Sequence, residues 1–204
     1  VESPSLGAVD DAASVAILID LAKDIRDGKV TTADNSVTIL LTSGEEVNLL
    51  GALAYVNEFL PTGNIGRKIP AMLINLDLVG QSGNLAYAES NGVFLKHYPA
   101  DIMLVNEVGK AWQAVSGKPI EKGEKSTDDA ACFMAKGIPS VTIYNTGIPG
   151  QGLGGYHSSA DNMQRVDLNN MAMVLATLTR IINNKSTGFI YFSASLFYLH
   201  AALY

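Results

Sequence analysis

The chain has 204 residues, of which 48% are hydrophobic and 17% are charged, and its formal net charge at pH 7 is −6. This composition is typical of a folded domain with a sizeable core and excludes a disordered chain. The basic residues are few and scattered, so nucleic acid is not expected as a partner. The single cysteine, Cys132, excludes an intramolecular disulfide and a Cys₂His₂ or Cys₄ zinc site.

Apolar residues alternate along the chain between helical and strand patterns. Helices are expected at 12–27, 49–60 and 101–116, shortly before Gly137, and from the N-cap Asp167 to Ile182; strands are expected at 36–42, 70–79, 84–88 and 140–144. The main strands are short, continuous apolar runs, as found in strands buried on both faces. This alternation predicts an α/β fold with a mostly parallel central sheet and helices on both faces.

The segment 187–204 is uncharged at pH 7 when His200 is neutral, and it is rich in aromatic residues. Its length is at the lower limit of what a membrane-spanning helix needs. We expect an additional element packed on the domain. The alternative is the beginning of a transmembrane helix, whose aromatic residues would suit a membrane interface.

Ionisable residues gather where the predicted strands end. Glu45 and Glu46 follow the first strand, Asp77 lies near the end of the second, and His157 is in the loop after the last, while Asp10 precedes the first helix. Ligands of open α/β sheets bind beyond the carboxyl ends of the strands. Taken singly, these residues are typical of helix caps and solvated loops, but a carboxylate within an apolar strand is costly unless it is paired or binds a cation. The set therefore indicates a metal site with oxygen and nitrogen ligands.

Five motifs occur in a fixed order. They are Gly-Ala-Val-Asp-Asp at 7–11, Ser-Gly-Glu-Glu-Val-Asn-Leu-Leu-Gly-Ala at 43–52, Asn-Leu-Asp-Leu-Val-Gly at 75–80, Asp-Asp-Ala-Ala-Cys-Phe-Met-Ala-Lys-Gly-Ile-Pro at 128–139, and Tyr-His-Ser-Ser-Ala-Asp at 156–161. Together they resemble the co-catalytic zinc aminopeptidase family, which includes bacterial leucyl aminopeptidases and has glutamate carboxypeptidase II and glutaminyl cyclase as relatives. The resemblance runs from about residue 7 to about residue 183. It implies the three-layer fold of zinc exopeptidases, with a zinc peptidase catalytic domain at 1–185 and an apolar C-terminal extension at 186–204.

The resemblance also implies roles for the ionisable residues. Asp10 matches the carboxylate that bridges two zinc ions. Glu46 and His157 match the remaining ligands of one zinc, and Asp77 matches a ligand of the other. Glu45 matches the general base. Neighbouring residues of an extended segment point in opposite directions, which would let Glu45 and Glu46 take separate roles.

Three further features follow from the same resemblance. Asp129 and Tyr156 are expected near the substrate. The peptide bond between Asp10 and Asp11 is expected to be cis. Ala130 stands where many members have a histidine, which leaves the substrate contacts near Asp129 open.

One family feature is missing from the sequence. The family's remaining zinc ligand is the histidine of a His-x-Asp motif, located upstream of the residue that aligns with Val1. We therefore expect an N-terminally truncated chain that lacks the first strands of the fold. It would bind one or two Zn²⁺ ions, and the second site, at Asp77, would be weakened.

The expected function is that of a zinc-dependent aminopeptidase, which removes N-terminal residues from peptides with metal-activated water. The alternatives are a single-zinc enzyme resembling glutaminyl cyclase and a catalytically impaired, peptidase-like binding scaffold. A peptide is the expected partner, and membrane contact through 187–204 is not favoured. The family resemblance alone favours a secreted, periplasmic or membrane-attached protein.

Overall fold

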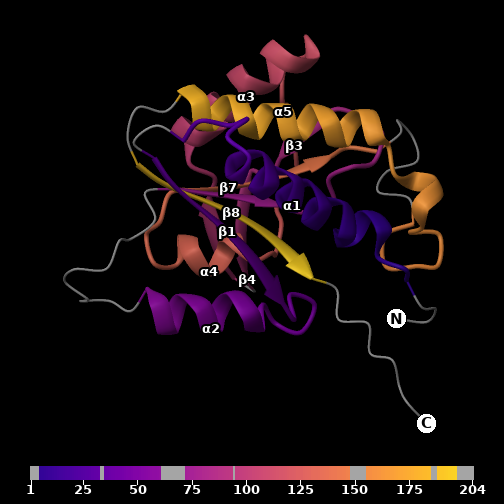
Figure 1. Cartoon of the computed structure of the whole chain (residues 1–204). Coiled ribbons are helices and arrows are strands. Elements are labelled where there is room, and N and C mark those ends of the chain that lie inside the picture. The colour runs from indigo at the N-terminus through magenta and orange to yellow at the C-terminus, as the bar shows by residue number, and fades with distance from the viewer. Residues whose placement is uncertain are drawn as a thin grey trace.

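The structure is a computed structural model that describes residues 5–32, 35–60, 72–93, 95–147, 155–184 and 188–196. Its centre is a six-stranded sheet with the strand order β1-β8-β2-β7-β3-β6 (Figure 1). The strands are β1 (Asn35–Ser43), β2 (Met72–Leu76), β3 (Leu85–Tyr87), β6 (Glu121–Lys122), β7 (Ser140–Asn145) and β8 (Gly188–Leu196). The first four strands of this order run parallel, β3 is antiparallel to β7, and β6 is parallel to β3. The predicted fold class is confirmed.

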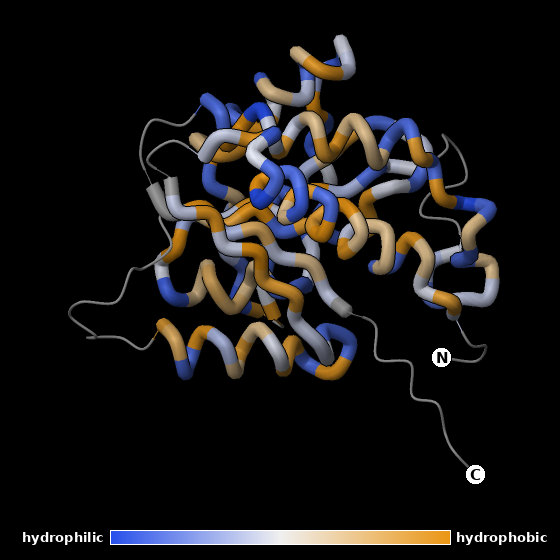
Figure 2. Tube along the Cα trace, viewed as in Figure 1, coloured by the Kyte–Doolittle hydropathy of each residue, from blue (hydrophilic) through white to orange (hydrophobic). Residues whose placement is uncertain are grey.

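Helices cover both faces of the sheet and form a three-layer structure (Figure 1). One face carries α1 (Ala13–Arg26), α3 (Ile102–Ser116) and α5 (Leu168–Asn184), and the other carries α2 (Leu50–Phe59) and α4 (Ala130–Met134). The larger core lies between the sheet and the first group of helices, and the smaller core lies beneath α2 and α4. Hydrophobic residues concentrate in the central strands (Figure 2). A two-stranded ribbon of β4 (Ser90–Val93) and β5 (Lys96–Pro99) was not predicted.

Capping residues set both ends of α3 and the start of α5. The Asp101 carboxylate accepts a hydrogen bond from the Leu104 amide (3.0 Å) at the start of α3, and Gly117, with φ of 73°, ends that helix. Asp167 caps α5 as predicted, because its Oδ1 accepts hydrogen bonds from the amides of Asn169 (3.0 Å) and Asn170 (3.2 Å). The longest helices therefore have the boundaries that the sequence indicates, within one or two residues.

The C-terminal strand β8 occupies a central position in the sheet, between β1 and β2. Ile190 and Phe192 are fully buried in the larger core, and Tyr191 packs in the smaller one. Residues 188–196 therefore pack as a strand of the six-stranded sheet, and the rest of the predicted extension 186–204 lies outside the described residues. Nothing in the sequence pattern indicates that this strand lies between two strands formed by much earlier segments.

The alternative of a transmembrane helix concerned residues 187–204, of which the structure describes residues 188–196, as strand β8. No helix in the described part of the chain is both long enough and apolar enough to cross a bilayer. Residues 197–204, the end of the segment for which this alternative was raised, lie outside the described residues.

The substitution Phe192→Ala tests the central position of β8. Because the Phe192 side chain is fully buried, we expect the variant to lose about 3–5 kcal/mol of the free energy of unfolding. Urea denaturation measures this loss. Leu168→Ala removes a side chain that is 71% exposed and should change stability by less than about 0.5 kcal/mol. A loss below about 1 kcal/mol for Phe192→Ala would show that β8 does not fill the core in solution.

Candidate metal centre

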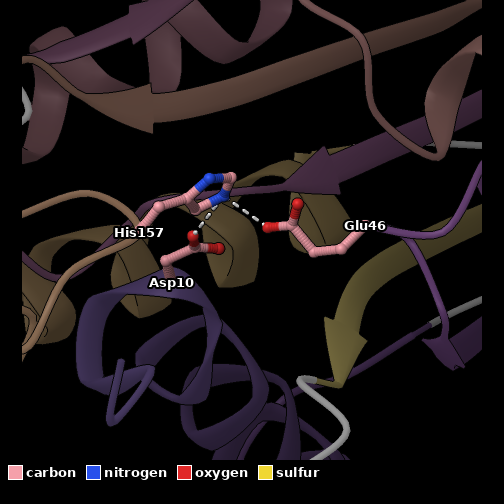
Figure 3. Close-up of side chains that lie close together, drawn as sticks. All are labelled: Asp10, Glu46 and His157. Atoms are coloured by element: carbon pink, nitrogen blue, oxygen red, sulfur yellow. Dashed lines mark hydrogen bonds and ion pairs between the residues drawn. The ribbon is translucent and has the colours of Figure 1, made fainter. Parts of the chain in front are cut away.

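Three of the predicted site residues meet at the carboxyl edge of the sheet. Asp10, Glu46 and His157 each offer one ligand atom, and these three atoms lie within 4.8 Å of one another. The His157 Nε2 atom is 2.5 Å from Glu46 Oε1 and 3.5 Å from Asp10 Oδ2. Figure 3 shows the three side chains pointing toward a common centre from segments far apart in the sequence. The predicted meeting of these residues is therefore observed.

The position of Asp10 is set by a carboxylate that the sequence analysis did not assign. Asp161 accepts hydrogen bonds from the backbone amides of Val9 (2.8 Å) and Asp10 (3.2 Å), and it is almost fully buried. The peptide bond between Asp10 and Asp11 is cis, as the resemblance implies. Asp161 is the last residue of the fifth motif, four positions after His157, and this placement is the signal by which it could have been found.

Glu45 and Glu46 lie in a tight turn, so the expectation of an extended segment is wrong. The Leu49 amide donates to the Glu45 carbonyl oxygen (2.9 Å), and the turn leads directly into α2. Gly51 in the first turn of α2 is needed for this arrangement, because a Cβ atom there would lie 2.4 Å from the carbonyl oxygen of Ser43. Strand alternation therefore cannot be the reason why Glu45 and Glu46 would take separate roles.

His157 is held beside an aromatic ring. Its backbone has a φ of 55°, in the left-handed region, and its imidazole stacks on the Tyr156 ring with centroids 3.7 Å apart and an interplanar angle of 24°. Tyr156 is 49% exposed. Burial, followed by the charges of Glu46 and Asp10, raises the pKa of its hydroxyl above the ordinary value. Tyr156 therefore borders the cluster, and its role in substrate binding stays a prediction.

The cluster has the properties of a cation site. Asp10 Oδ2 is buried and has no hydrogen-bond partner, although it faces His157. Burial and the charge of Glu46 raise the pKa of Asp10 to about 6. A buried carboxylate without a partner is unfavourable, and a cation between these groups would remove the cost. One imidazole nitrogen and two carboxylate oxygens are a donor set that zinc accepts. These residues therefore fit the metal that the resemblance implies.

Asp77 does not belong to this cluster. It follows β2, and its side chain lines a cavity of about 390 Å³. The other residues lining this cavity are Leu78, Glu124, Lys125, Ser126, Thr142, Tyr144 and Thr146. Burial, then the charges of Asp128 and Asp10, raise the pKa of Asp77 well above its ordinary value. Its role as ligand of a second zinc stays a prediction.

Asp129 precedes α4 and is almost fully buried. Its carboxylate accepts a hydrogen bond from the Thr42 hydroxyl on β1, and burial raises its pKa to about 6. Ala130, the next residue, is fully buried. Asp129 therefore contacts the strand that leads to Glu45, while its expected contact with substrate stays a prediction.

Comparison with known protein families decides the assignment. Residues 1–182 match the model of peptidase family M28. The chain belongs to this family. The sequence has no match among curated proteins. The resemblance identified from the five motifs is thus confirmed.

Solved structures show the same fold. An aminopeptidase from Aneurinibacillus sp. strain AM-1 matches with a TM-score of 0.62 and 18% identity, covering 92% of this chain and 44% of that one. The zinc aminopeptidase BSAP from Bacillus subtilis matches with a TM-score of 0.66 and 18% identity, covering 87% and 42%. Glutaminyl cyclase from Porphyromonas gingivalis matches with a TM-score of 0.50 and 23% identity, covering 66% and 46%. The chain thus spans less than half the length of each of these proteins.

Glu45, in this M28 chain, lies outside the three-residue cluster but within its electrostatic field. Burial raises its pKa to about 8, and the charges of Glu46 and Asp129 add to the effect. A cation held by Glu46 and Asp10 would oppose these charges and lower the pKa of Glu45 again. In the metal-free protein the Glu45 side chain is therefore protonated at neutral pH, whereas a nearby cation favours its ionised form.

These shifts predict how the stability of the metal-free M28 chain depends on pH. The pKa of Glu45 rises from 4.5 to about 8 on folding. Between these values the folded state binds more protons than the unfolded state, so the free energy of unfolding falls as pH rises and levels off above about pH 8. Asp10 contributes in the same direction between its ordinary value of 3.8 and about 6.

We therefore expect the metal-free chain to be less stable at pH 8 than at pH 5, by at least about 1 kcal/mol. Denaturation in the presence of a chelator at the two pH values measures the difference. Saturating zinc should stabilise the protein more at pH 8, where the carboxylates give up their protons more readily. Equal or greater stability of the chelated protein at pH 8 would contradict the account.

Proposed function

We propose that this chain is a zinc-dependent exopeptidase of the aminopeptidase type, which hydrolyses the N-terminal peptide bond of its substrates. The observation that carries the proposal is the meeting of Asp10, Glu46 and His157, in which Oδ2 of Asp10 is buried and has no hydrogen-bond partner. Glu45 directly precedes Glu46 in the chain. Membership in peptidase family M28 and the fold shared with two bacterial aminopeptidases support it.

In this proposal, Asp10, Glu46 and His157 hold the zinc ion. Bound zinc supplies Lewis-acid chemistry, which polarises the scissile carbonyl and makes water a better nucleophile. Asp161 keeps Asp10 in place through the amides of Val9 and Asp10, and Tyr156 restrains the His157 ring by stacking. These contacts fix the orientation of the ligand side chains, and a metal site needs such contacts to keep a defined geometry.

Glu45 acts as the general base. Its carboxylate takes a proton from the water that attacks the carbonyl carbon, and it passes a proton to the nitrogen of the leaving amine. The C–N bond breaks as the amine leaves, and the products are a free amino acid and a shortened peptide. Glu45 suits this role because a cation held by Asp10 and Glu46 would bring its pKa down from about 8 toward neutral pH, where a carboxyl group can both accept and return a proton.

The acidic surroundings favour a substrate with a free, positively charged α-amine. Asp77 lines a cavity, the charge of the buried Asp128 raises the pKa of Asp77, and the charge of Asp77 in turn raises the pKa of the buried Asp11. An ammonium group placed here would offset their mutual repulsion. This preference is the proposed source of exopeptidase action.

A single-zinc cyclase of N-terminal glutamine is the second candidate. It is favoured by the three-residue cluster, which leaves Asp77 outside, and by the fold shared with glutaminyl cyclase from Porphyromonas gingivalis. The chain's one tryptophan, Trp112, is buried in α3, where its Nε1–H donates to Asn84 Oδ1 (2.8 Å). A glutaminyl cyclase is expected to have a substrate pocket lined by tryptophan, and the buried Trp112 cannot line one. The aminopeptidase is therefore the better supported function.

Three substrates distinguish the candidates. The purified chain is incubated, with and without zinc, with an aminoacyl p-nitroanilide, with its N-acetylated analogue and with a peptide that begins with glutamine. We expect zinc-dependent hydrolysis of the free-amine anilide only. Cyclisation of the glutamine peptide without hydrolysis would favour the cyclase. Zinc binding without either reaction would favour a binding scaffold.

A further inference from the structure

Strand β8 connects the two strands that deliver the acidic residues of the site. It pairs in parallel with β1 over Asn35–Ser43 and with β2 over Met72–Leu76. Glu45 and Glu46 follow β1, and Asp77 follows β2. Among the described strands, β1 pairs with β8 alone. The distance between the two acidic segments therefore spans two strand spacings, about 10 Å, and it depends on β8.

The side chains of β8 change character along the strand. Ile190 and Phe192 are large and fully buried, whereas Ser193 and Ala194, equally buried, are small. The change comes where the strand reaches the site, since Ala194 pairs in register with Leu76, the residue before Asp77. A strand that only filled the core would keep large apolar residues here, because a buried hydroxyl is unfavourable unless it is hydrogen-bonded.

The Ser193 hydroxyl has a specific partner. It donates to Oδ1 of Asn75, its register neighbour on β2 (2.5 Å), and Nδ2 of Asn75 donates to Oδ1 of Asp128 (3.1 Å). The Thr142 hydroxyl on β7 donates to the same carboxylate oxygen (2.8 Å). Because Ser193 engages the carbonyl oxygen of the Asn75 amide, the amino group of that amide faces Asp128. The hydrogen bonds therefore form a chain from β8 to Asp128.

Asp128 acts electrostatically on the acidic residues of the site. It is almost fully buried, its Oδ1 also accepts the Ala130 amide (2.9 Å) at the start of α4, and its charge acts on both Asp77 and Glu45. A rotation of the Asp128 carboxylate would therefore change the field at both residues.

The carboxyl end of β8 makes a second contact with the site. The Ser195 amide donates to Oδ2 of Asp11 (3.1 Å), the residue joined to Asp10 by the cis peptide bond. The Ala194 carbonyl oxygen accepts from the Thr42 hydroxyl (3.2 Å). The end of β8 thus contacts Asp11, next to the ligand Asp10, and β1, which leads to Glu46. These contacts are in addition to the hydrogen bonds that run from Ser193 through Asn75 to Asp128.

We propose that Ser193 is a positioning residue of the active centre, which acts through Asn75 to hold Asp128 in its orientation beside Asp77 and Glu45. The C-terminal strand thereby takes part in assembling the site in addition to filling the sheet. The effect on turnover rests on the proposed peptidase function, whereas the effect on the Asn75 amide does not.

Ser193→Ala in the full chain tests the proposal. We expect kcat on an aminoacyl p-nitroanilide to fall about tenfold, within the range that small misplacements of active-site groups cause. KM and the zinc content should stay within about twofold of wild type. In ¹⁵N NMR spectra, the side-chain amide protons of Asn75 should shift and exchange faster with solvent. Ser193→Thr, which keeps the hydroxyl, should restore both kcat and the amide signals.

Ser140→Ala is the matched control. Ser140 is a buried serine at the start of β7, and its hydroxyl donates to the Ile138 carbonyl oxygen (2.8 Å), at the opposite end of the strand from the site. It should lower thermal stability comparably and leave kcat and the Asn75 amide unchanged. An equal loss of kcat in both variants, or no loss in Ser193→Ala, would overturn the proposal. If wild type proves inactive, the Asn75 signals decide alone: altered signals in Ser193→Ala, restored in Ser193→Thr, support the proposal, and unaltered signals overturn it.

Discussion

Glu45→Gln should remove turnover while leaving zinc binding intact. The substitution keeps the size of the side chain and removes its capacity to accept a proton. We expect kcat to fall by about 10²–10⁴-fold, which is the usual contribution of a general base. Zinc content should stay at the wild-type value, because Glu45 lies outside the cluster of Asp10, Glu46 and His157. Single-turnover kinetics and metal analysis on the same preparation measure both quantities.

Glu58→Gln, on the exposed side of α2, is the control for the same chemical change and should leave kcat unaltered. Parallel loss of zinc and activity in Glu45→Gln would mean that the roles of Glu45 and Glu46 are exchanged. Full activity of Glu45→Gln would exclude it as the base and would require another acceptor for the proton.

His157→Ala should abolish tight zinc binding. His157 is the one imidazole of the cluster, and its loss leaves only the two carboxylates of Asp10 and Glu46, which hold zinc poorly without a nitrogen ligand. We expect the affinity for zinc to fall by more than about 100-fold, beyond the effect usual for residues that only support a ligand. Competition with a chromophoric chelator measures the affinity.

His97→Ala provides the control, since His97 is exposed on β5 and is not part of the cluster. It should bind zinc as wild type does. If the two variants lose zinc equally, or if His157→Ala keeps the wild-type affinity, the metal is held elsewhere.

Much of the architecture could be predicted from the sequence because local patterns determine it. The helices from 13 to 26 and from 102 to 116 have clear apolar faces and polar or glycine boundaries, and Asp167 caps the last helix as expected. The meeting of Asp10, Glu46 and His157 could be predicted because the carboxyl ends of parallel strands share one edge of the sheet and because the family resemblance singles out these three residues among the ionisable ones there.

The position of β8 could not be predicted, because strand order is a non-local property. The apolar run at the end of the chain indicates a buried element, but it does not indicate that this element separates β1 from β2. The hydrogen bonds of Asp161 and Ser193 are non-local in the same way. Their partners, at Val9 and Asp10 for one and Asn75 for the other, are more than a hundred residues away in the sequence.

The turn at Glu45 and Glu46 illustrates a local error. The preceding apolar strand suggested that the extended backbone continues through both glutamates. Gly44, with φ of 69°, instead ends the strand and begins the turn into α2. The signal was present in the sequence, since a glycine directly after a strand often marks such a change of direction.

The most direct test of the account is a crystal structure of the zinc-loaded chain with anomalous data collected at the zinc edge. The account predicts a strong peak about 2.0–2.2 Å from carboxylate oxygens of Asp10 and Glu46 and from a ring nitrogen of His157. It also predicts that a second site at Asp77 is empty or much weaker, because no imidazole has been assigned to it. A principal peak away from these three side chains, or a structure in which they point to separate surfaces, would contradict the account.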